Sequence, residues 1–137
     1  MCGIAGVIHF DGKPVDVEAI RRMTDAIAYR GPDGEGQWAD GPVGIGHRRL
    51  AVLDPTPAGS QPMFDDSGRY VLSYNGEVYN FKELRTDLEG LGTAFRSGTD
   101  TEVVLQALIR WGTSALTMFN GMFALAFHDR LDGRLLL

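Results

Sequence analysis

The sequence has 137 residues, of which 44% are hydrophobic, so we expect one domain with its own core, neither a peptide nor a multidomain enzyme. The net charge is −5 and the basic residues are scattered, which argues against a nucleic-acid partner. No hydrophobic run approaches the roughly 20 residues of a membrane span, and no signal sequence begins the chain. We therefore expect a cytoplasmic protein without a membrane partner.

Few residues can carry chemistry. Cys2 is the single cysteine, which excludes a disulfide framework within the chain. The three histidines, His9, His47 and His128, are dispersed and predict no metal site. Any nucleophilic catalysis should therefore use the thiol of Cys2. Glycine makes up 18 of the 137 residues, well above the usual fraction of about 7%, which indicates many tight turns and close backbone approaches.

The first part of the chain is expected to form a strand, a helix and two more strands. Small and β-branched residues from Cys2 to Ile8 predict a buried strand. A helix is expected over residues 17–29, because hydrophobic residues recur there at helical spacing and Asp16 precedes them as a capping residue. Short strands are expected at Val43–His47 and Leu50–Leu53.

A turn-rich segment from Asp54 to Arg69 follows, and a loop of that length in a small domain is often functional. Tyr70–Tyr74 then predicts a strand that runs into a turn at Asn75–Gly76. The remaining expected elements are a helix over residues 81–91 with a capping box of Asn80 and Glu83, a helix over 101–111, and strands over 121–127 and 134–137. The chain ends on three leucines without the polar residues usual at a terminus, which indicates a piece of a longer protein.

Cys2 can carry an acyl-transfer reaction once Met1 is removed. Its thiol would be the nucleophile, and its freed α-amine, with a reference pKa of about 7.7–8.0, would be the general base. This mode of activation needs no histidine partner. The alternative is an inert core residue, which is the more frequent role of a lone cysteine among small residues.

A thioester-forming enzyme also needs hydrogen-bond donors for an oxyanion. Asn75 and Gly76 fit this need, with a side-chain amide beside a backbone N–H, although the same pair is a common turn signal. Asn120 and Gly121 form a second such pair without polar neighbours, which we interpret as a plain turn.

An amino-acid substrate needs an arginine for its carboxylate and acidic groups for its ammonium. The candidates are Arg49, Glu77 and Asp100. Each of them is also compatible with a plain surface charge, and Asp100 with the N-cap of the following helix.

Seven segments together resemble one family, the N-terminal glutaminase domain of asparagine synthetases. This domain is a class II glutamine amidotransferase of the N-terminal-nucleophile hydrolase superfamily. The segments are MCGIAG at 1–6, RGPDGEG at 30–36, HRRLAVLD at 47–54, GSQPM at 59–63, NGEVYNF at 75–81, SGTDTE at 97–102 and GMFALAF at 121–127. The resemblance covers residues 1–137 and implies a partial type 2 glutamine amidotransferase domain.

The resemblance implies a role for each matching residue. Cys2 would be the nucleophile and its amine the base, while Asn75 and Gly76 would form the oxyanion hole. Arg49 would bind the α-carboxylate of L-glutamine, and Glu77 and Asp100 would hold its α-ammonium group. The remaining implied substrate-binding positions are Leu50, Ala51, Val52 and Leu53, through their backbone. The implied reaction is hydrolysis of L-glutamine to glutamate and ammonia through a Cys2 thioester.

The implied fold is α+β, a four-layer αββα sandwich of two antiparallel sheets. In the family a synthetase domain with an SGGxDS pyrophosphate-binding loop follows, and this motif is absent from the present sequence. ATP and Mg²⁺ are therefore expected only on a synthetase domain outside these residues, and no cofactor or metal is expected within them. The expected partners are L-glutamine, that C-terminal synthetase domain and a second copy in a homodimer.

The main functional hypothesis is ammonia supply for ATP-dependent asparagine synthesis. Two alternatives stay open. The ammonia could serve a related amide-forming enzyme of an antibiotic, lasso-peptide or surface-polysaccharide pathway, or the domain could be a catalytically silent structural module. The presence of all the implied site residues argues against the silent module.

Overall fold

The computed structural model describes residues 1–137, which form seven strands and three α-helices. The strands are β1 (Gly3–Ile8), β2 (Gly34–Asp40), β3 (Val43–Arg49), β4 (Met63–Phe64), β5 (Tyr70–Val78), β6 (Gly121–Asp129) and β7 (Arg134–Leu136). The helices are α1 (Val17–Ala26), α2 (Phe81–Gly90) and α3 (Asp100–Trp111), and short 3₁₀ turns lie at Ala28–Arg30, Pro57–Gly59 and Gly112–Thr117. None of the helices is long and hydrophobic enough to cross a membrane.

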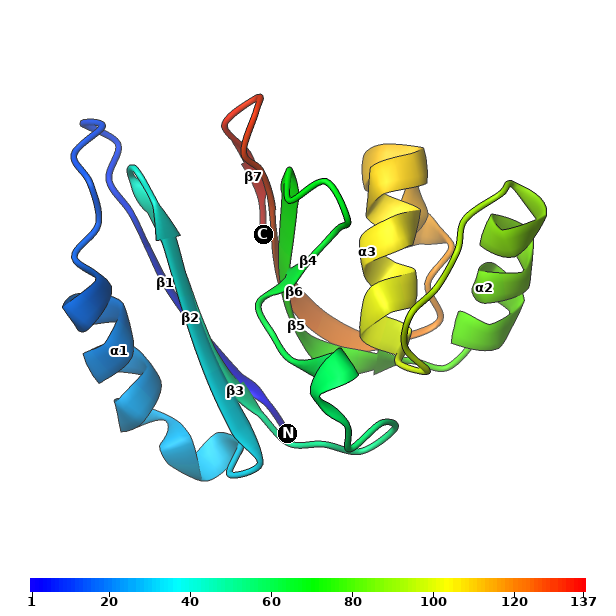
Figure 1. Cartoon of the computed structure of the whole chain (residues 1–137), viewed down its shortest axis with the longest axis horizontal. Helices are drawn as coiled ribbons and strands as arrows, with labels where there is room; N and C mark the ends of the chain where they lie inside the picture. Colours follow the sequence, from blue (N-terminus) through cyan, green and yellow to red (C-terminus); the bar gives the residue numbers. More distant parts are fainter.

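The strands form two antiparallel sheets that face each other (Figure 1). The first sheet has the order β1-β3-β2, and α1 covers its outer face. The second has the order β4-β5-β6-β7, and α2 and α3 cover its outer face. The layers therefore follow the sequence helix, sheet, sheet, helices, and the expected αββα sandwich is confirmed.

Alternating glycines on β3 allow α1 to lie directly on the first sheet. A Cβ at Gly44 would approach Ile20 to 2.9 Å, and one at Gly46 would approach the Thr24 hydroxyl to 2.5 Å. Because side chains alternate across a strand, Val43 and Ile45 then point to the opposite face, toward the second sheet. The high glycine content thus serves close layer packing here.

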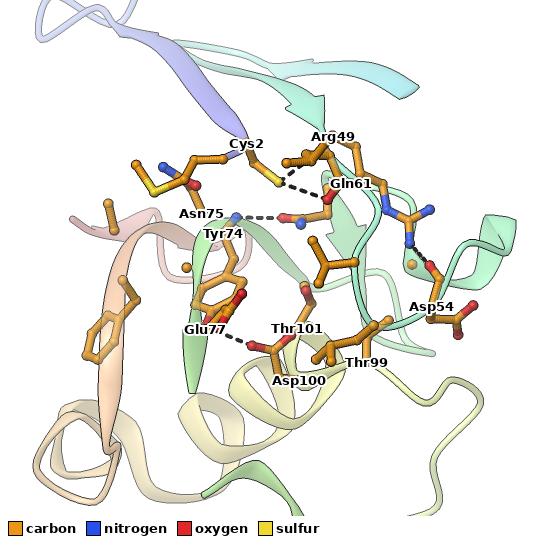
Figure 2. Close-up of a pocket in the computed structure, with 18 of the residues that line it drawn as sticks. Cys2, Arg49, Asp54, Gln61, Tyr74, Asn75, Glu77, Thr99, Asp100 and Thr101 are labelled. Atoms are coloured by element: carbon orange, nitrogen blue, oxygen red, sulfur yellow. Dashed lines mark hydrogen bonds between the residues drawn. The ribbon is translucent and has the colours of Figure 1, made fainter. Parts of the chain in front are cut away.

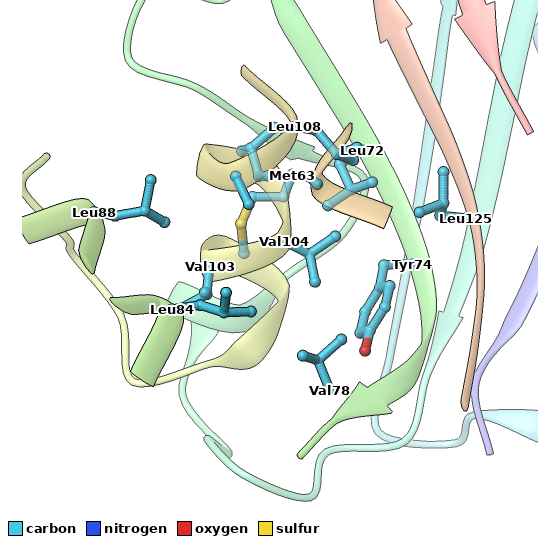
Figure 3. Close-up of a cluster of buried hydrophobic side chains, with 13 residues drawn as sticks. Met63, Leu72, Tyr74, Val78, Leu84, Leu88, Val103, Val104, Leu108 and Leu125 are labelled. Carbon is cyan, nitrogen blue, oxygen red and sulfur yellow. The ribbon is translucent and has the colours of Figure 1, made fainter. Parts of the chain in front are cut away.

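The larger hydrophobic core lies between the second sheet and its helices (Figure 3). It includes Leu72 on β5, Leu88 on α2 and Leu105 on α3, all without solvent exposure. Burying one such side chain contributes about 1.5–3 kcal/mol to folding. The core between the two sheets is smaller and consists of Val43, Ile45 and Ala126, with Trp38 and Leu135 packed against them.

Several expected elements are confirmed with small shifts. The first strand begins at Gly3, the helix expected over 17–29 ends at Ala26 and passes into a 3₁₀ turn, and both later helices form. Asp16 caps α1 as expected, because its carboxylate accepts the N–H of Glu18 at 3.0 Å. The two C-terminal strands are also present.

The strand expected at Leu50–Leu53 is wrong. The chain leaves the sheet after Arg49, because Gly3 of β1 already pairs with Arg48 and Gly34 of β2 pairs with Arg49. Beyond Arg49, the N–H groups of Leu50 and Ala51 donate to the side chains of Cys2 and Asp33, not to the backbone of a neighbouring strand.

The turn expected at Asn75–Gly76 is also wrong. Both residues continue β5, where they pair with Ala124 and Phe123 of β6. A Cβ at Gly76 would overlap the carbonyl oxygen of Met122, so the glycine is required by a close backbone approach.

The capping box of Asn80 and Glu83 does not form. The Asn80 amide instead donates to the carbonyl of Met118 at 3.0 Å and accepts the N–H of Asn120 at 2.9 Å. The side chain therefore joins the start of α2 to the start of β6. Strand β2 was not expected, because its sequence GEGQWAD is rich in glycine and polar residues, yet it pairs along its whole length with β3.

Candidate functional site

A cavity of about 470 Å³ lies where the ends of several elements meet (Figure 2). The residues before β1, the end of β3 and the segment after it, the second half of β5, the start of α3 and the start of β6 all contribute to its wall. Of the residues predicted for the site, it is lined by Cys2, Arg49, Leu50, Val52, Leu53, Asn75, Gly76, Glu77 and Asp100. The expected site residues are thus brought together, with one exception.

The exception is Ala51, which does not line the cavity. Its N–H donates to the carboxylate of Asp33 at 2.9 Å, which turns this part of the backbone away from the cavity. The prediction that all of Leu50–Leu53 would line the site is therefore wrong at this residue.

Cys2 is half-buried at the cavity wall, directly before β1. The N–H of Leu50 donates to its Sγ at 3.3 Å, and the guanidinium of Arg30 donates to its carbonyl at 2.9 Å. These bonds hold both the backbone and the sulfur of Cys2 in place. Met1 also lines the cavity, although 74% of its surface is exposed.

One edge of β5 is left open by the shortness of β4. Strand β4 pairs with β5 only at Val71 and Leu72, whereas β6 pairs with β5 from Tyr70 to Val78. Beyond Leu72, the backbone groups of β5 that point away from β6 therefore need other partners.

Side chains supply two of these partners. The Oε1 atom of Gln61 accepts the N–H of Tyr74 at 2.6 Å, and a carboxylate oxygen of Asp100 accepts the N–H of Val78 at 3.1 Å. Alternate residues of an antiparallel strand turn their N–H groups to opposite sides. The N–H of Gly76, midway between Tyr74 and Val78, therefore points to the same open side, where the cavity lies.

Asp100 lies at the first position of α3 and is buried. Its Oδ2 accepts from the hydroxyl of Tyr74 at 3.0 Å as well as from Val78 N–H. Burial raises the pKa of Asp100 above its ordinary value, while these hydrogen bonds oppose the shift. Burial, together with the neighbouring Asp100 charge, likewise raises the pKa of Tyr74. The helix N-cap is Thr99, whose hydroxyl accepts the N–H of Glu102 at 3.2 Å, so Asp100 is free of that role.

Arg49 closes the opposite part of the cavity and also organises the loop after β3. Its guanidinium donates to the carbonyl of Thr56 at 2.8 Å and to the carbonyl of Asp54, toward which Figure 2 shows it turned. A Cβ at Gly59 would overlap the same guanidinium, which explains the glycine in this loop. Glu77 is exposed at the cavity wall.

Among the cavity residues that sequence reasoning missed, two are buried and polar. Gln61 is 7% exposed and Tyr74 is 2% exposed, and both line the cavity. Gln61 accepts the N–H of Tyr74, and the Tyr74 hydroxyl donates to Asp100; no spacing pattern in the sequence indicates these contacts. Gln61 lies in the GSQPM segment, so only the family resemblance could have pointed to it. The functional loop expected over Asp54–Arg69 includes Gln61, but the residue itself was not predicted.

Comparisons with known proteins show what this chain is similar to. A family model described as "Glutamine amidotransferase domain" matches residues 1–137. The chain is 40% identical over 132 residues to "Asparagine synthetase [glutamine-hydrolyzing] 3" of Bacillus subtilis, a match that covers 94% of this chain and 21% of the relative. It is 39% identical over 151 residues to "Putative asparagine synthetase [glutamine-hydrolyzing] 2" of Methanocaldococcus jannaschii, with 97% and 28% covered. The chain thus spans less than a third of the length of these relatives.

A solved structure shares the fold. It is a glutamine phosphoribosylpyrophosphate (PRPP) amidotransferase from B. subtilis complexed with ADP and GMP, with a TM-score of 0.78 and 22% sequence identity. The match covers 94% of this chain and 35% of that one. At this level of identity the likeness concerns the fold alone, and it agrees with the two-sheet layering described above.

The burial of Asp100 predicts the effect of removing its charge. Because the folded-state pKa of Asp100 is raised, its contribution to stability is present below the ordinary Asp pKa and is lost as the pH rises through the raised value. Asp100→Asn should therefore increase the free energy of unfolding at pH about 7 relative to the wild type. The amide oxygen can still accept the two hydrogen bonds that reach Oδ2.

Urea unfolding of both proteins at neutral pH and at pH about 4 measures this difference, which should shrink at the lower pH. Asp87→Asn, at an exposed position on α2, is the matched control and should change stability by no more than about 0.5 kcal/mol. A less stable Asp100→Asn protein at neutral pH would contradict the cost assigned to the buried charge.

Proposed function

This chain belongs to the glutamine amidotransferase domain family, and from that membership we propose that it hydrolyses L-glutamine to glutamate and ammonia through a thioester on Cys2. The observation that carries the proposal is the shared cavity of the Cys2 thiol and the open edge of β5 at Asn75 and Gly76. A nucleophile and a set of oxyanion donors that face one space are what acyl transfer requires.

The charges around the cavity support a zwitterionic amino acid as substrate. Arg49 contributes a cation on one side, while Asp100 and Glu77 contribute carboxylates on another. A guanidinium has five N–H donors, so Arg49 keeps free donors for the α-carboxylate besides those that hold the loop. Both hydrogen bonds to Asp100 reach Oδ2, which leaves Oδ1 for the α-ammonium group. The backbone of Leu50, Val52 and Leu53 completes this pocket.

In the proposed reaction, the α-amine of Cys2 takes the thiol proton and the sulfur attacks the side-chain amide carbon of glutamine. The carbonyl π electrons move to oxygen, and the side-chain amide of Asn75 and the N–H of Gly76 stabilise the resulting oxyanion. When the carbonyl forms again, the C–N bond breaks and the amine proton leaves with the nitrogen as ammonia. Water then hydrolyses the thioester to glutamate and restores the Cys2 thiol.

We further propose that the ammonia serves asparagine synthesis by an ATP-dependent synthetase domain of the parent protein. The printed names of the relatives, together with the short share of their length that this chain covers, support this destination. ATP and Mg²⁺ on that domain, a homodimer and a cytoplasmic location stay predictions. The antibiotic, lasso-peptide and polysaccharide alternatives and the silent module have no observation in their favour.

Replacing the nucleophile tests the proposed function. Cys2→Ala should lower glutamine hydrolysis by at least about 10⁴-fold, because no other thiol exists in the chain. Glutamine binding should stay measurable by calorimetry, since the charged groups remain. Ammonia-dependent synthesis by the full-length protein should also survive. Retained hydrolysis in Cys2→Ala would overturn the assignment.

The state of the N-terminus gives a second test. An amide nitrogen that carries methionine cannot act as a base near neutral pH, so the mechanism requires removal of Met1. Met1 is exposed and lines the cavity, so its removal is sterically accessible and clears space at Cys2. Active protein should therefore have an intact mass one methionine lower than the sequence.

A variant that retains Met1 behind an uncleaved tag should fold but lose glutaminase activity. Mass spectrometry establishes the N-terminus of each preparation, and the hydrolysis assay reports its activity. Full turnover by protein shown to keep Met1 would mean that another group activates the thiol.

A further inference from the structure

His47 is fully buried and forms a hydrogen bond with the backbone next to the proposed oxyanion donors. It lies on β3, on the face that points toward the second sheet, and 0% of its surface is exposed. Its Nε2 lies 3.0 Å from the carbonyl oxygen of Tyr74. A carbonyl can only accept, so Nε2 carries the hydrogen and donates it.

Gln61 forms a hydrogen bond with the other backbone group of Tyr74, its N–H. Its Oε1 accepts the N–H of Tyr74 at 2.6 Å. Both groups of Tyr74 point away from β6, toward the side that β4 does not reach, because β4 begins only at Met63, opposite Leu72. The side chains of His47 and Gln61 therefore take the places that the backbone of a longer β4 would fill.

The burial of His47 carries a cost in stability. Its Nδ1 is buried and has no hydrogen-bond partner, which is an unfavourable arrangement for a polar atom. Burial also lowers the pKa of His47 to about 4, so the ring is neutral near pH 7 and donates through a single fixed nitrogen. An apolar side chain would fill this position without an unpaired nitrogen, so the histidine is best explained by the bond it donates.

That bond has a direct geometric consequence for the site. The carbonyl of Tyr74 belongs to the same planar peptide unit as the nitrogen of Asn75. Holding both the carbonyl and the N–H of Tyr74 at this edge restricts the backbone from which the Asn75 side chain and the Gly76 N–H project. We propose that His47 and Gln61 are positioning residues that hold the oxyanion donors Asn75 and Gly76 in place, an inference that rests on the proposed glutaminase function.

The test compares His47→Leu with His47→Gln in the full-length protein that carries this sequence. Leucine fills the space but cannot donate, whereas the glutamine amide can place a donor near the position of Nε2. His47→Leu should lower kcat for glutamine hydrolysis about 10- to 100-fold and leave KM within about threefold, because oxyanion stabilisation acts in the transition state. His47→Gln should recover most of the lost kcat.

A matched control separates positioning from general loss of stability. Val71→Ala removes buried volume from β5 three residues away from Tyr74, at a position that does not line the cavity. It should lower the free energy of unfolding yet keep kcat close to that of the wild type. If His47→Leu does not fold, Gln61→Leu applies the same test from the N–H side and should also lower kcat with little change in KM.

Each result decides between the two proposals. A wild-type protein that does not hydrolyse glutamine overturns the proposed function and this inference together. An active wild type overturns only the inference if His47→Leu, or Gln61→Leu in its place, keeps a normal kcat. Equal losses of kcat in His47→Leu and His47→Gln also overturn it, because the donated hydrogen bond would then not be responsible.

Discussion

Strand β4 begins only at Met63, opposite Leu72, and the site depends on the backbone groups of β5 beyond Leu72 that this leaves without a neighbouring strand. An unpaired N–H in a folded protein must find another acceptor or face a space that a ligand can fill. Along this edge, side chains satisfy the N–H groups of Tyr74 and Val78. The N–H of Gly76 between them faces the cavity, so a donor is ready before any substrate arrives, as preorganised catalysis requires.

The same edge connects the two halves of the sandwich. His47 reaches Tyr74 from the first sheet, Gln61 reaches it from the loop between β3 and β4, and Asp100 reaches Val78 from α3. Each of these side chains is buried and polar, and the charge of Asp100 is held in the interior at a cost in stability. Polar groups whose burial has a cost are thus concentrated around the cavity, which is a common relation between stability and function.

The sequence predicted an element correctly where its hydrophobic pattern was local and strong. The hydrophobic spacing of α1 and α3 and the continuous hydrophobic run of β6 predicted those elements correctly. Asn75–Gly76 was misread because a glycine required by the carbonyl of Met122 looks the same in sequence as a glycine required by a turn. Strand β2 was missed because its stability comes from pairing with β3. His47 and Gln61 could not be found from sequence, because their partner is the backbone of Tyr74, which lies on the part of β5 that the short β4 does not reach.

The central claim is that the Cys2 thiol attacks an amide carbon whose oxygen faces the open edge of β5. A crystal structure of the processed protein with glutamate γ-semialdehyde tests it most directly, because the thiol adds to the aldehyde and leaves a tetrahedral carbon bearing one oxygen. The account predicts a bond from Cys2 Sγ to that carbon, with the oxygen about 2.7–3.1 Å from the Gly76 nitrogen and the Asn75 side-chain amide. An adduct on Cys2 whose oxygen points away from both donors would contradict the account.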